Sequence, residues 1–117
     1  MEFVDSSSSI SQFLAASFSE EFKSFRVWKM EERVELPCLL IKTVGKNTVQ
    51  LVVRADSDIE ALEKCTEIGN YLKRNFSDVE GINIFDIDFQ TTPTPNVDEI
   101  TGKDEAWCYL RINYFEN

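Results

Sequence analysis

The sequence predicts an α+β domain with a single mixed or antiparallel sheet of about five strands and a central amphipathic helix packed on one face. Two observations lead to this fold class. Residues 48–54 (TVQLVVR) alternate apolar and polar side chains and are rich in β-branched residues, as in a half-buried strand. From Ile59 to Phe76, apolar residues recur three and four positions apart, which is the period of a helix with one apolar stripe. This helix needs a sheet to cover, and the strand before it belongs to that sheet.

The central helix is predicted over residues 57–76. Ser57 and Glu60 have the spacing of a capping box. In this motif the serine hydroxyl accepts a hydrogen bond from the Glu60 amide, and the Glu60 carboxylate accepts one from the Ser57 amide. The residues expected to face the sheet are Leu62, Cys65, Ile68, Leu72 and Phe76.

A shorter helix is predicted near the start of the chain. Its apolar residues lie at helical spacing, and Ser8 or Ser9 is an acceptable N-cap. We expect the helix to end near Ser19. Residues 1–9, which include four consecutive serines, are typical of a flexible start. The apolar positions of the helix are Ile10, Phe13, Leu14 and Phe18.

Three strands are predicted between the two helices. Residues 25–34 alternate in polarity, and residues 36–43 form the continuous apolar run of a buried strand. Residues 44–47 are typical of a turn, which would join the 36–43 strand to the 48–54 strand as a hairpin.

Two further strands are predicted after the central helix, at residues 82–89 and 106–115, so the element order is α-β-β-β-α-β-β. The second of these has aromatic residues on both faces, which predicts cover on both sides. Residues 90–102 contain proline, asparagine and glycine, and predict a long loop. We expect residues 90–105 to be mobile in the isolated protein and to become ordered on assembly or partner binding.

Size and charge limit the function. The chain has 117 residues, so residues 1–117 are expected to form a single domain. Twelve basic against 21 acidic residues give a formal net charge of −9. Proteins that bind nucleic acids place Lys and Arg in patches, so this balance argues against a phosphate backbone as the main partner.

The start of the chain and its cysteines predict a cytosolic location. The first residues are acidic and polar, unlike a signal peptide, and no apolar run approaches the roughly 20 residues that span a bilayer. The three cysteines Cys38, Cys65 and Cys108 lie far apart in apolar stretches. We therefore expect buried, reduced thiols and no membrane partner.

Catalytic and metal-binding patterns are weak. The chain has no histidine to activate a serine or cysteine nucleophile, and no CxxC spacing, so we expect no enzyme activity, cofactor or metal. Asp86 and Asp88 lie two apart on a strand and would point to one face, where they could hold a hard cation or act as acid and base. The stronger interpretation is two solvent-facing carboxylates on a half-exposed sheet.

Five other residues are candidates for contact with a partner. Asp98, Glu99, Asp104 and Glu105 flank a glycine in the predicted loop, which suits a solvated or partner-facing acidic loop better than a calcium site. Trp28 is flanked by charged residues and is a candidate contact residue.

Residues 49–72 (VQLVVRADSDIEALEKCTEIGNYL) resemble the tail-terminator and minor capsid (head–tail joining) proteins of long-tailed phages. Those proteins carry a strand ending in V-R, a short polar break and a helix with an EAL…I…L pattern. The family's proline-containing loop, D-E pair and final strand are similar to residues 90–95, 104–105 and 109–114, and its second strand is similar to residues 37–41. The resemblance covers roughly residues 36–117.

The resemblance implies a ring, usually of six copies, which stops tail-tube polymerisation and presents a surface to the head. The implied partners are further copies of the chain, tail-tube proteins and head-completion proteins, with DNA passing through without specific binding. The implied location is the host cytoplasm during assembly and then the virion. An acidic channel would keep phosphates from adhering. The candidate lining residues are Asp86, Asp88, Asp98, Glu99, Asp104 and Glu105.

Two other functions fit the same sequence. One is an acidic inhibitor, a DNA mimic that presents carboxylates to a nucleic-acid-binding protein. The other is a small-molecule regulatory domain of ferredoxin-like topology, which rests on analogy of fold alone.

Overall fold

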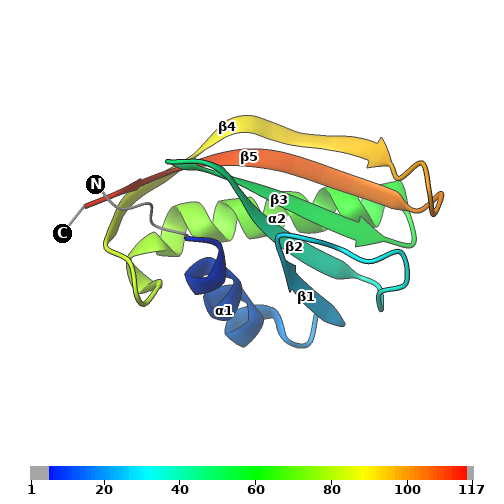
Figure 1. Cartoon of the computed structure of the whole chain (residues 1–117), viewed down its shortest axis with the longest axis horizontal. Helices are drawn as coiled ribbons and strands as arrows, with labels where there is room; N and C mark the ends of the chain where they lie inside the picture. The colour runs from blue at the N-terminus through cyan, green and yellow to red at the C-terminus, as the bar shows by residue number, and fades with distance from the viewer. Residues whose placement is uncertain (1–5, 116–117) are drawn as a thin grey trace.

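A five-stranded sheet forms one layer of the molecule, and two helices form the second (Figure 1). The structure is a computed structural model that describes residues 6–115. The predicted α+β class and the order α-β-β-β-α-β-β are confirmed. The elements are α1 (Ser7–Phe18), β1 (Ser24–Val27), β2 (Cys38–Gly45), β3 (Thr48–Ala55), α2 (Asp58–Asn75), the 3-10 turn η1 (Phe76–Asp78), β4 (Ile84–Val97) and β5 (Asp104–Tyr114).

The sheet is mixed, with the strand order β1-β2-β3-β5-β4. β1 is parallel to β2, and the other neighbours are antiparallel. β2 and β3 form the predicted hairpin, and β3 pairs with β5 along its whole length, from Thr48 opposite Arg111 to Ala55 opposite Asp104. β4 therefore lies at one edge of the sheet and the short β1 at the other.

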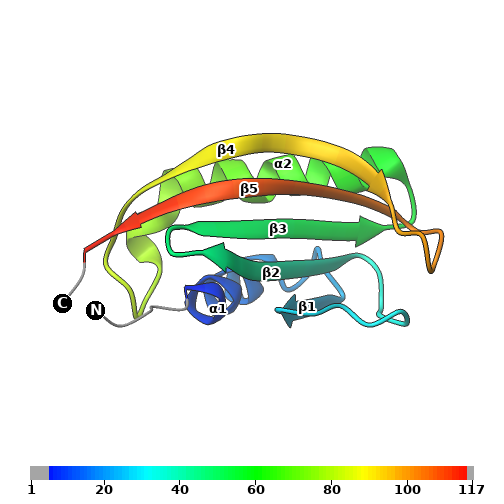
Figure 2. The same cartoon turned by 45° about the horizontal axis from the view of Figure 1, so that its top comes forward.

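Both helices pack on the same face of the sheet. Figure 2 shows α2 behind β4 and β5, and α1 below β2. α1 lies over β1 and β2, and α2 lies over β3, β5 and β4. The residues that α2 buries against the sheet are Ala61, Cys65, Ile68, Gly69 and Leu72. Leu62 and Phe76, which were expected on the same stripe, are partly buried against it.

The N-terminal cap of α2 differs in one bond from the predicted capping box. Ser57 is the N-cap, and its hydroxyl accepts from the Glu60 amide at 3.1 Å, as predicted. The Glu60 carboxylate accepts from the backbone amide of Asp56 at 3.4 Å, one residue earlier than the motif requires. Ile59, where the apolar stripe was expected to start, is exposed in the first turn of α2.

Gly69 allows α2 to approach the sheet closely. A Cβ atom at this position would lie 2.4 Å from Cζ of Phe89 on β4. That distance is far inside van der Waals contact, so residue 69 must lack a side chain if Phe89 is to pack beneath the helix. Lys73, one helical turn further on, places its ammonium 5.7 Å from the centre of the Phe89 ring.

α1 lies where a helix was predicted, but its cap differs. The N-cap is Ser6, whose side chain makes no capping hydrogen bond, and Ser8 and Ser9 lie inside the helix. Of the start expected to be flexible, residues 7–9 are helical and residues 1–5 lie outside the described part of the chain. The Ser7 hydroxyl is hydrogen-bonded to the hydroxyl of Thr43, which ties α1 to β2.

β1 is shorter than predicted. The expected strand over residues 25–34 ends at Val27, because the next residue, Trp28, has a φ of 74°. This left-handed conformation is rare for a bulky residue and turns the chain away from the sheet. The Trp28 amide still donates to the Ile41 carbonyl at 3.0 Å, so the turn begins directly beside β2.

β4 is longer than predicted, and the expected loop over residues 90–102 is wrong for residues 90–97. These residues continue β4 and pair with β5. Proline is tolerated because β4 is an edge strand, where a missing N–H need not break a ladder. Three register irregularities accommodate the extra residues. Only residues 98–103 form a turn, closed by the Gly102 amide donating to the Asp98 carbonyl at 2.8 Å.

The predicted cover on both faces of β5 is also wrong. Ala106, Cys108, Leu110 and Ile112 are fully buried beneath α2. Trp107, Tyr109 and Asn113 alternate with them and are half-buried on the opposite face. Within residues 6–115, no helix lies over that face, which we call the open face of the sheet.

The three cysteines are buried free thiols, and two of them are neighbours. The Cys65 thiol on α2 donates to Cys108 Sγ on β5, with 3.8 Å between the sulfur atoms. This hydrogen bond and burial raise the pKa of the Cys65 thiol, so it stays protonated. These cysteines therefore act as small apolar core residues.

Candidate functional site

A buried ion pair lies at the end of the open face where β3 finishes and β5 begins. Arg54 Nε donates to Glu105 Oε2 at 2.9 Å, and both side chains are buried. Arg54 Nη1 donates to the Glu31 carbonyl at 2.8 Å, and Nη2 lies 3.8 Å from Asp98 Oδ2. Asn96 Nδ2 donates to Glu105 Oε1 at 3.3 Å. Arg54 thus holds the 98–103 turn and the segment before β2 to the sheet, and Glu105 is enclosed rather than presented to a partner.

The acidic turn between β4 and β5 is organised by its own hydrogen bonds. Asp98 Oδ2 accepts from the Thr101 hydroxyl at 2.7 Å and from the Thr101 amide at 2.9 Å. These bonds hold the pKa of Asp98 below its usual value. Glu99 is exposed, and Asp104 is half-buried. Within residues 6–115, no group of three or more His, Cys, Asp or Glu side chains could hold a metal ion.

Asp86 and Asp88 point to one side of β4, as predicted, but each has its own partner. Both are exposed, and they lie opposite Asn113 and Arg111 on β5. Asp86 Oδ2 accepts from Asn113 Nδ2 at 3.3 Å, and Asp88 Oδ1 lies 3.2 Å from Lys73 Nζ. The hydrogen bond from Lys73 lowers the pKa of Asp88. The two carboxylates are therefore exposed to solvent with separate partners, and they are not arranged around a common cation.

The open face has an aromatic centre. The rings of Trp107 and Tyr109 lie 5.2 Å apart at an interplanar angle of 60°, so they form one continuous surface along β5. Val52 and Gln50, the residues that pair with them on β3, are also half-buried. Trp28 is a separate feature: it is 44% exposed and lies beside β2 near the β1 edge.

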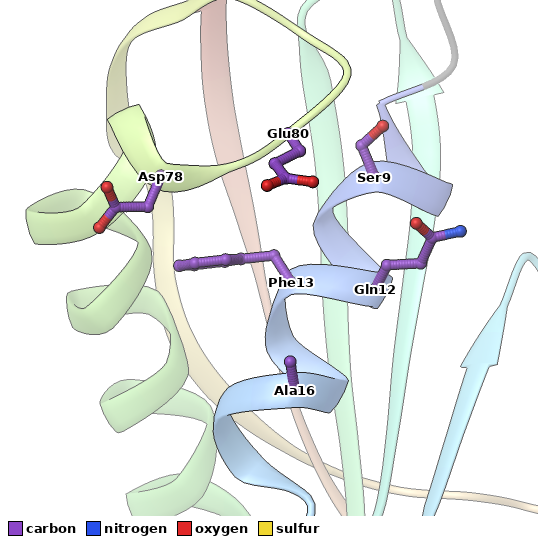
Figure 3. A pocket seen from close by; sticks show the side chains of 6 residues that line it. All are labelled: Ser9, Gln12, Phe13, Ala16, Asp78 and Glu80. Carbon is purple, nitrogen blue, oxygen red and sulfur yellow. The ribbon is translucent and has the colours of Figure 1, made fainter.

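A cleft on the helical side of the molecule was not predicted. It has a volume of about 260 Å³ and lies between α1 and the segment after η1 (Figure 3). Phe13 forms an apolar wall and stacks on Tyr71 with 5.6 Å between ring centres. The lining residues are Ser9, Gln12, Phe13, Ala16, Asp78 and Glu80. The two walls are separated by more than 60 residues, so no local motif in the sequence indicates the cleft.

Neither a known protein family nor a curated protein sequence matches this chain. No helix among the described residues is long and apolar enough to cross a membrane. Every buried side-chain nitrogen and oxygen in residues 6–115 has a hydrogen-bond partner.

Sequence reasoning missed the exposed apolar side chains. Within residues 6–115, seven large apolar residues are exposed, and of these only Trp28 was singled out from the sequence as a contact residue. The exposed set is Trp28, Val44, Ile59, Phe85, Val97, Ile100 and Phe115. Ile100 lies in the turn between β4 and β5, where an apolar residue is a signal in itself because turns are usually polar.

Proposed function

We propose that this chain is a structural assembly protein of the tail-terminator or head–tail joining type. It forms a ring of identical copies that caps the tail tube of a long-tailed phage and connects the tube to the head. Its partners are further copies of itself, tail-tube proteins and head-completion proteins. It acts by protein contact and catalyses no reaction, first in the host cytoplasm and then in the virion.

The observation that carries this proposal is the open face of the sheet. When one face of an antiparallel sheet is exposed to solvent, the side chains on that face are usually polar. Here its centre is Trp107, Tyr109 and Val52, all half-buried. Tyr and Trp are enriched at protein interfaces, because each offers a large apolar area together with a polar group. We assign this face to contact with the next component of the particle.

The distribution of charge also supports a ring through which DNA passes. Asp86, Asp88 and Glu99 are exposed, and Asp104 is half-buried, so these carboxylates are available to line a channel. Like charge keeps a phosphate backbone from binding to the lining. Glu105 is left out of the proposed lining because it is buried with Arg54.

The acidic inhibitor has less support from the same residues. A mimic of DNA needs carboxylates that are free to meet the partner's Lys and Arg side chains. Asp88 is already paired with Lys73, and Asp98 and Glu105 lie against Arg54. The acidic inhibitor is therefore the alternative function that the experiment below has to distinguish from the ring.

Light scattering coupled to size-exclusion chromatography, followed by negative-stain electron microscopy, tests the proposal. We expect closed rings of several copies over a range of protein and salt concentrations. A protein that stays monomeric over that range, and that binds a DNA-binding protein tightly, would replace the ring with the inhibitor. The variant Glu63→Ala is a suitable control, because this exposed residue lies on the solvent side of α2, away from the open face.

A further inference from the structure

The cleft between α1 and the segment after η1 has no role in the proposed ring. Its volume is about 260 Å³. Pockets that hold drug-sized ligands measure roughly 300–1,000 Å³, so this cleft suits a small molecule or a single protruding side chain. Figure 3 shows the Phe13 ring extending from α1 toward η1, with Asp78 and Glu80 on the opposite wall.

Contacts on both sides of the cleft fix α1 against the rest of the molecule. Gly81 has a φ of 88°, and a Cβ atom there would lie 3.1 Å from Ser9 Oγ, so the segment after η1 passes close to α1 at this residue. On the other side the Tyr71 hydroxyl donates to Ser17 Oγ at 3.1 Å, and the Tyr71 ring lies 4.9 Å from the ring of Phe18. The cleft is therefore bounded by packed contacts and is formed without a ligand.

Asp78 and Glu80 line the same wall because Val79 is buried between them. Val79 is 4% exposed and has extended backbone, with a φ of −73° and a ψ of 117°. Side chains two positions apart in extended backbone point to the same side, so burial of Val79 turns both neighbours outward. Within residues 6–115, neither carboxylate forms an ion pair.

The lining of the cleft combines negative charge with apolar surface. α1 contains no charged residue, so the two carboxylates give the lining a formal charge of −2. Phe13 and Ala16 supply the apolar surface, and Ser9 and Gln12 supply further hydrogen-bond acceptors. A complementary ligand is cationic at one end and apolar along its stem. Carboxylates and the face of an aromatic ring both stabilise an ammonium group.

The chain already holds one of its own ammonium groups with this combination of partners. Lys73 Nζ lies 3.2 Å from Asp88 Oδ1 and 5.7 Å from the centre of the Phe89 ring. The cleft offers the same kinds of group, a carboxylate and a phenylalanine ring. Its lining in the described part of the chain includes no Lys or Arg side chain that could occupy it.

We propose that the cleft binds a primary ammonium group carried on an aliphatic stem. The ammonium pairs with the carboxylates of Asp78 and Glu80, and the stem lies along Phe13 and Ala16, as the stems of lysine side chains lie along apolar surface elsewhere in proteins. A free aliphatic amine and a lysine side chain of another protein share this chemistry. The inference goes beyond the proposed function and needs no contact between copies of the chain.

Titration followed by NMR of the backbone amides tests the inference. At neutral pH a primary amine is charged, and physiological salt screens its general attraction to a protein of net charge −9. n-Butylammonium chloride should shift the signals of residues 9–16 and 78–81 and reach saturation. Butan-1-ol and butyrate, which replace the positive charge with none or with a negative charge, should bind at least about tenfold more weakly. N-acetyl-glycyl-lysyl-glycinamide presents a lysine side chain without terminal charges.

Variants of the lining identify the groups that hold the ammonium. Asp78→Asn and Glu80→Gln should each weaken binding about fivefold, which is the effect of losing one partly exposed ion pair. Glu63→Gln is the matched control, because it removes an exposed carboxylate on the solvent side of α2, and it should bind like the wild type. Ala16→Lys adds a tethered ammonium to the wall of the cleft and should weaken binding of the free amine.

Saturable binding of the peptide would identify a lysine side chain as the ligand, and binding of n-butylammonium alone would identify a free amine. Binding of neither probe would overturn the inference. So would equal binding of butan-1-ol, or equal binding by the wild type, Asp78→Asn and Glu80→Gln. Shifts without saturation that extend to residues 86–88 and 98–99 would show only a general attraction to acidic surface, and would also overturn it. None of these results depends on whether rings form, so the proposed function is tested separately.

Discussion

Two single residues determine how closely the layers and loops of this protein pack. Gly69 lets α2 come down onto Phe89, and Arg54 joins the turn end of the sheet to the segment that precedes β2. Both effects depend on partners that are distant in sequence. Residue 69 is separated from Phe89 by 20 positions, and Arg54 from Glu105 by 51.

Gly69→Ala should lower the free energy of unfolding by about 1–2 kcal/mol. Alanine is favoured over glycine in a helix by roughly 1 kcal/mol, but forcing an extra methyl group into a packed site costs typically 1–3 kcal/mol. Because a Cβ atom at residue 69 would lie only 2.4 Å from Phe89 Cζ, the cost of the extra methyl group should exceed the gain in helix propensity. Urea unfolding measures the change, and Phe89→Ala in the same chain should remove most of it. A Gly69→Ala protein that is more stable than the wild type would contradict this account.

Arg54→Met should destabilise the protein by roughly 3–5 kcal/mol, because Glu105 would keep a buried charge without its main partner. The double variant Arg54→Met with Glu105→Leu should recover much of that loss, since apolar residues of similar volume replace a buried pair at little net cost. Chemical denaturation of the wild type, both single variants and the double variant gives the coupling energy. Equal losses in the single and double variants would mean that the pair does not act as a unit.

At the scale of elements, the sequence pattern correctly predicted the helices and strands whose bounds are set by interactions between residues close together in the chain. The β2–β3 hairpin and α2 lie within a few residues of their predicted bounds, because alternation, helical period and the Ser57 cap all act over short distances. β4 was cut short in the prediction, since Pro93 and Pro95 are turn signals unless the strand is known to lie at an edge. Edge position follows from the whole sheet order and cannot be obtained from residues 84–97 alone.

The candidate surfaces were harder to predict than the fold. Asp86, Asp88 and Glu99 are exposed as expected, but Glu105 is buried because β3 places Arg54 beside it. The alternation of β5 correctly separated Trp107 and Tyr109 from the core residues. Whether a second layer covers those aromatic residues depends on which face of the sheet each helix packs against. The sequence pattern of one strand does not give that information.

Leu72→Ala tests the packing of α2 as an element. Leu72 is fully buried in the stripe that faces the sheet, so its truncation should cost about 2–5 kcal/mol of unfolding free energy. Glu63→Ala, on the solvent side of the same helix, should change it by less than about 0.5 kcal/mol. Thermal or urea unfolding distinguishes the two variants. Similar small effects for both would show that α2 is not packed as described.

At the scale of the whole molecule, net charge opposes association. Each copy carries −9, so six copies at −9 each would carry −54. Apolar burial has to overcome this repulsion, and dissolved salt helps because it screens charges beyond roughly 8 Å at physiological ionic strength.

Assembly should therefore strengthen as ionic strength rises from a few millimolar to physiological values. Sedimentation velocity at fixed protein concentration, in a series of sodium chloride concentrations, measures the assembled fraction. A wild-type assembly that weakens steadily with added salt would show that ion pairs between copies dominate.

The free edge of β4 affects how the protein behaves before it has any neighbours. A 14-residue edge strand is long enough to template the cross-β stacking of amyloid fibres. In this chain Pro93 and Pro95 lack the N–H groups that such stacking uses, the register irregularities break the flat edge, and Asp86 with Asp88 repels an identical strand laid alongside. These features disfavour edge-to-edge pairing between newly made copies.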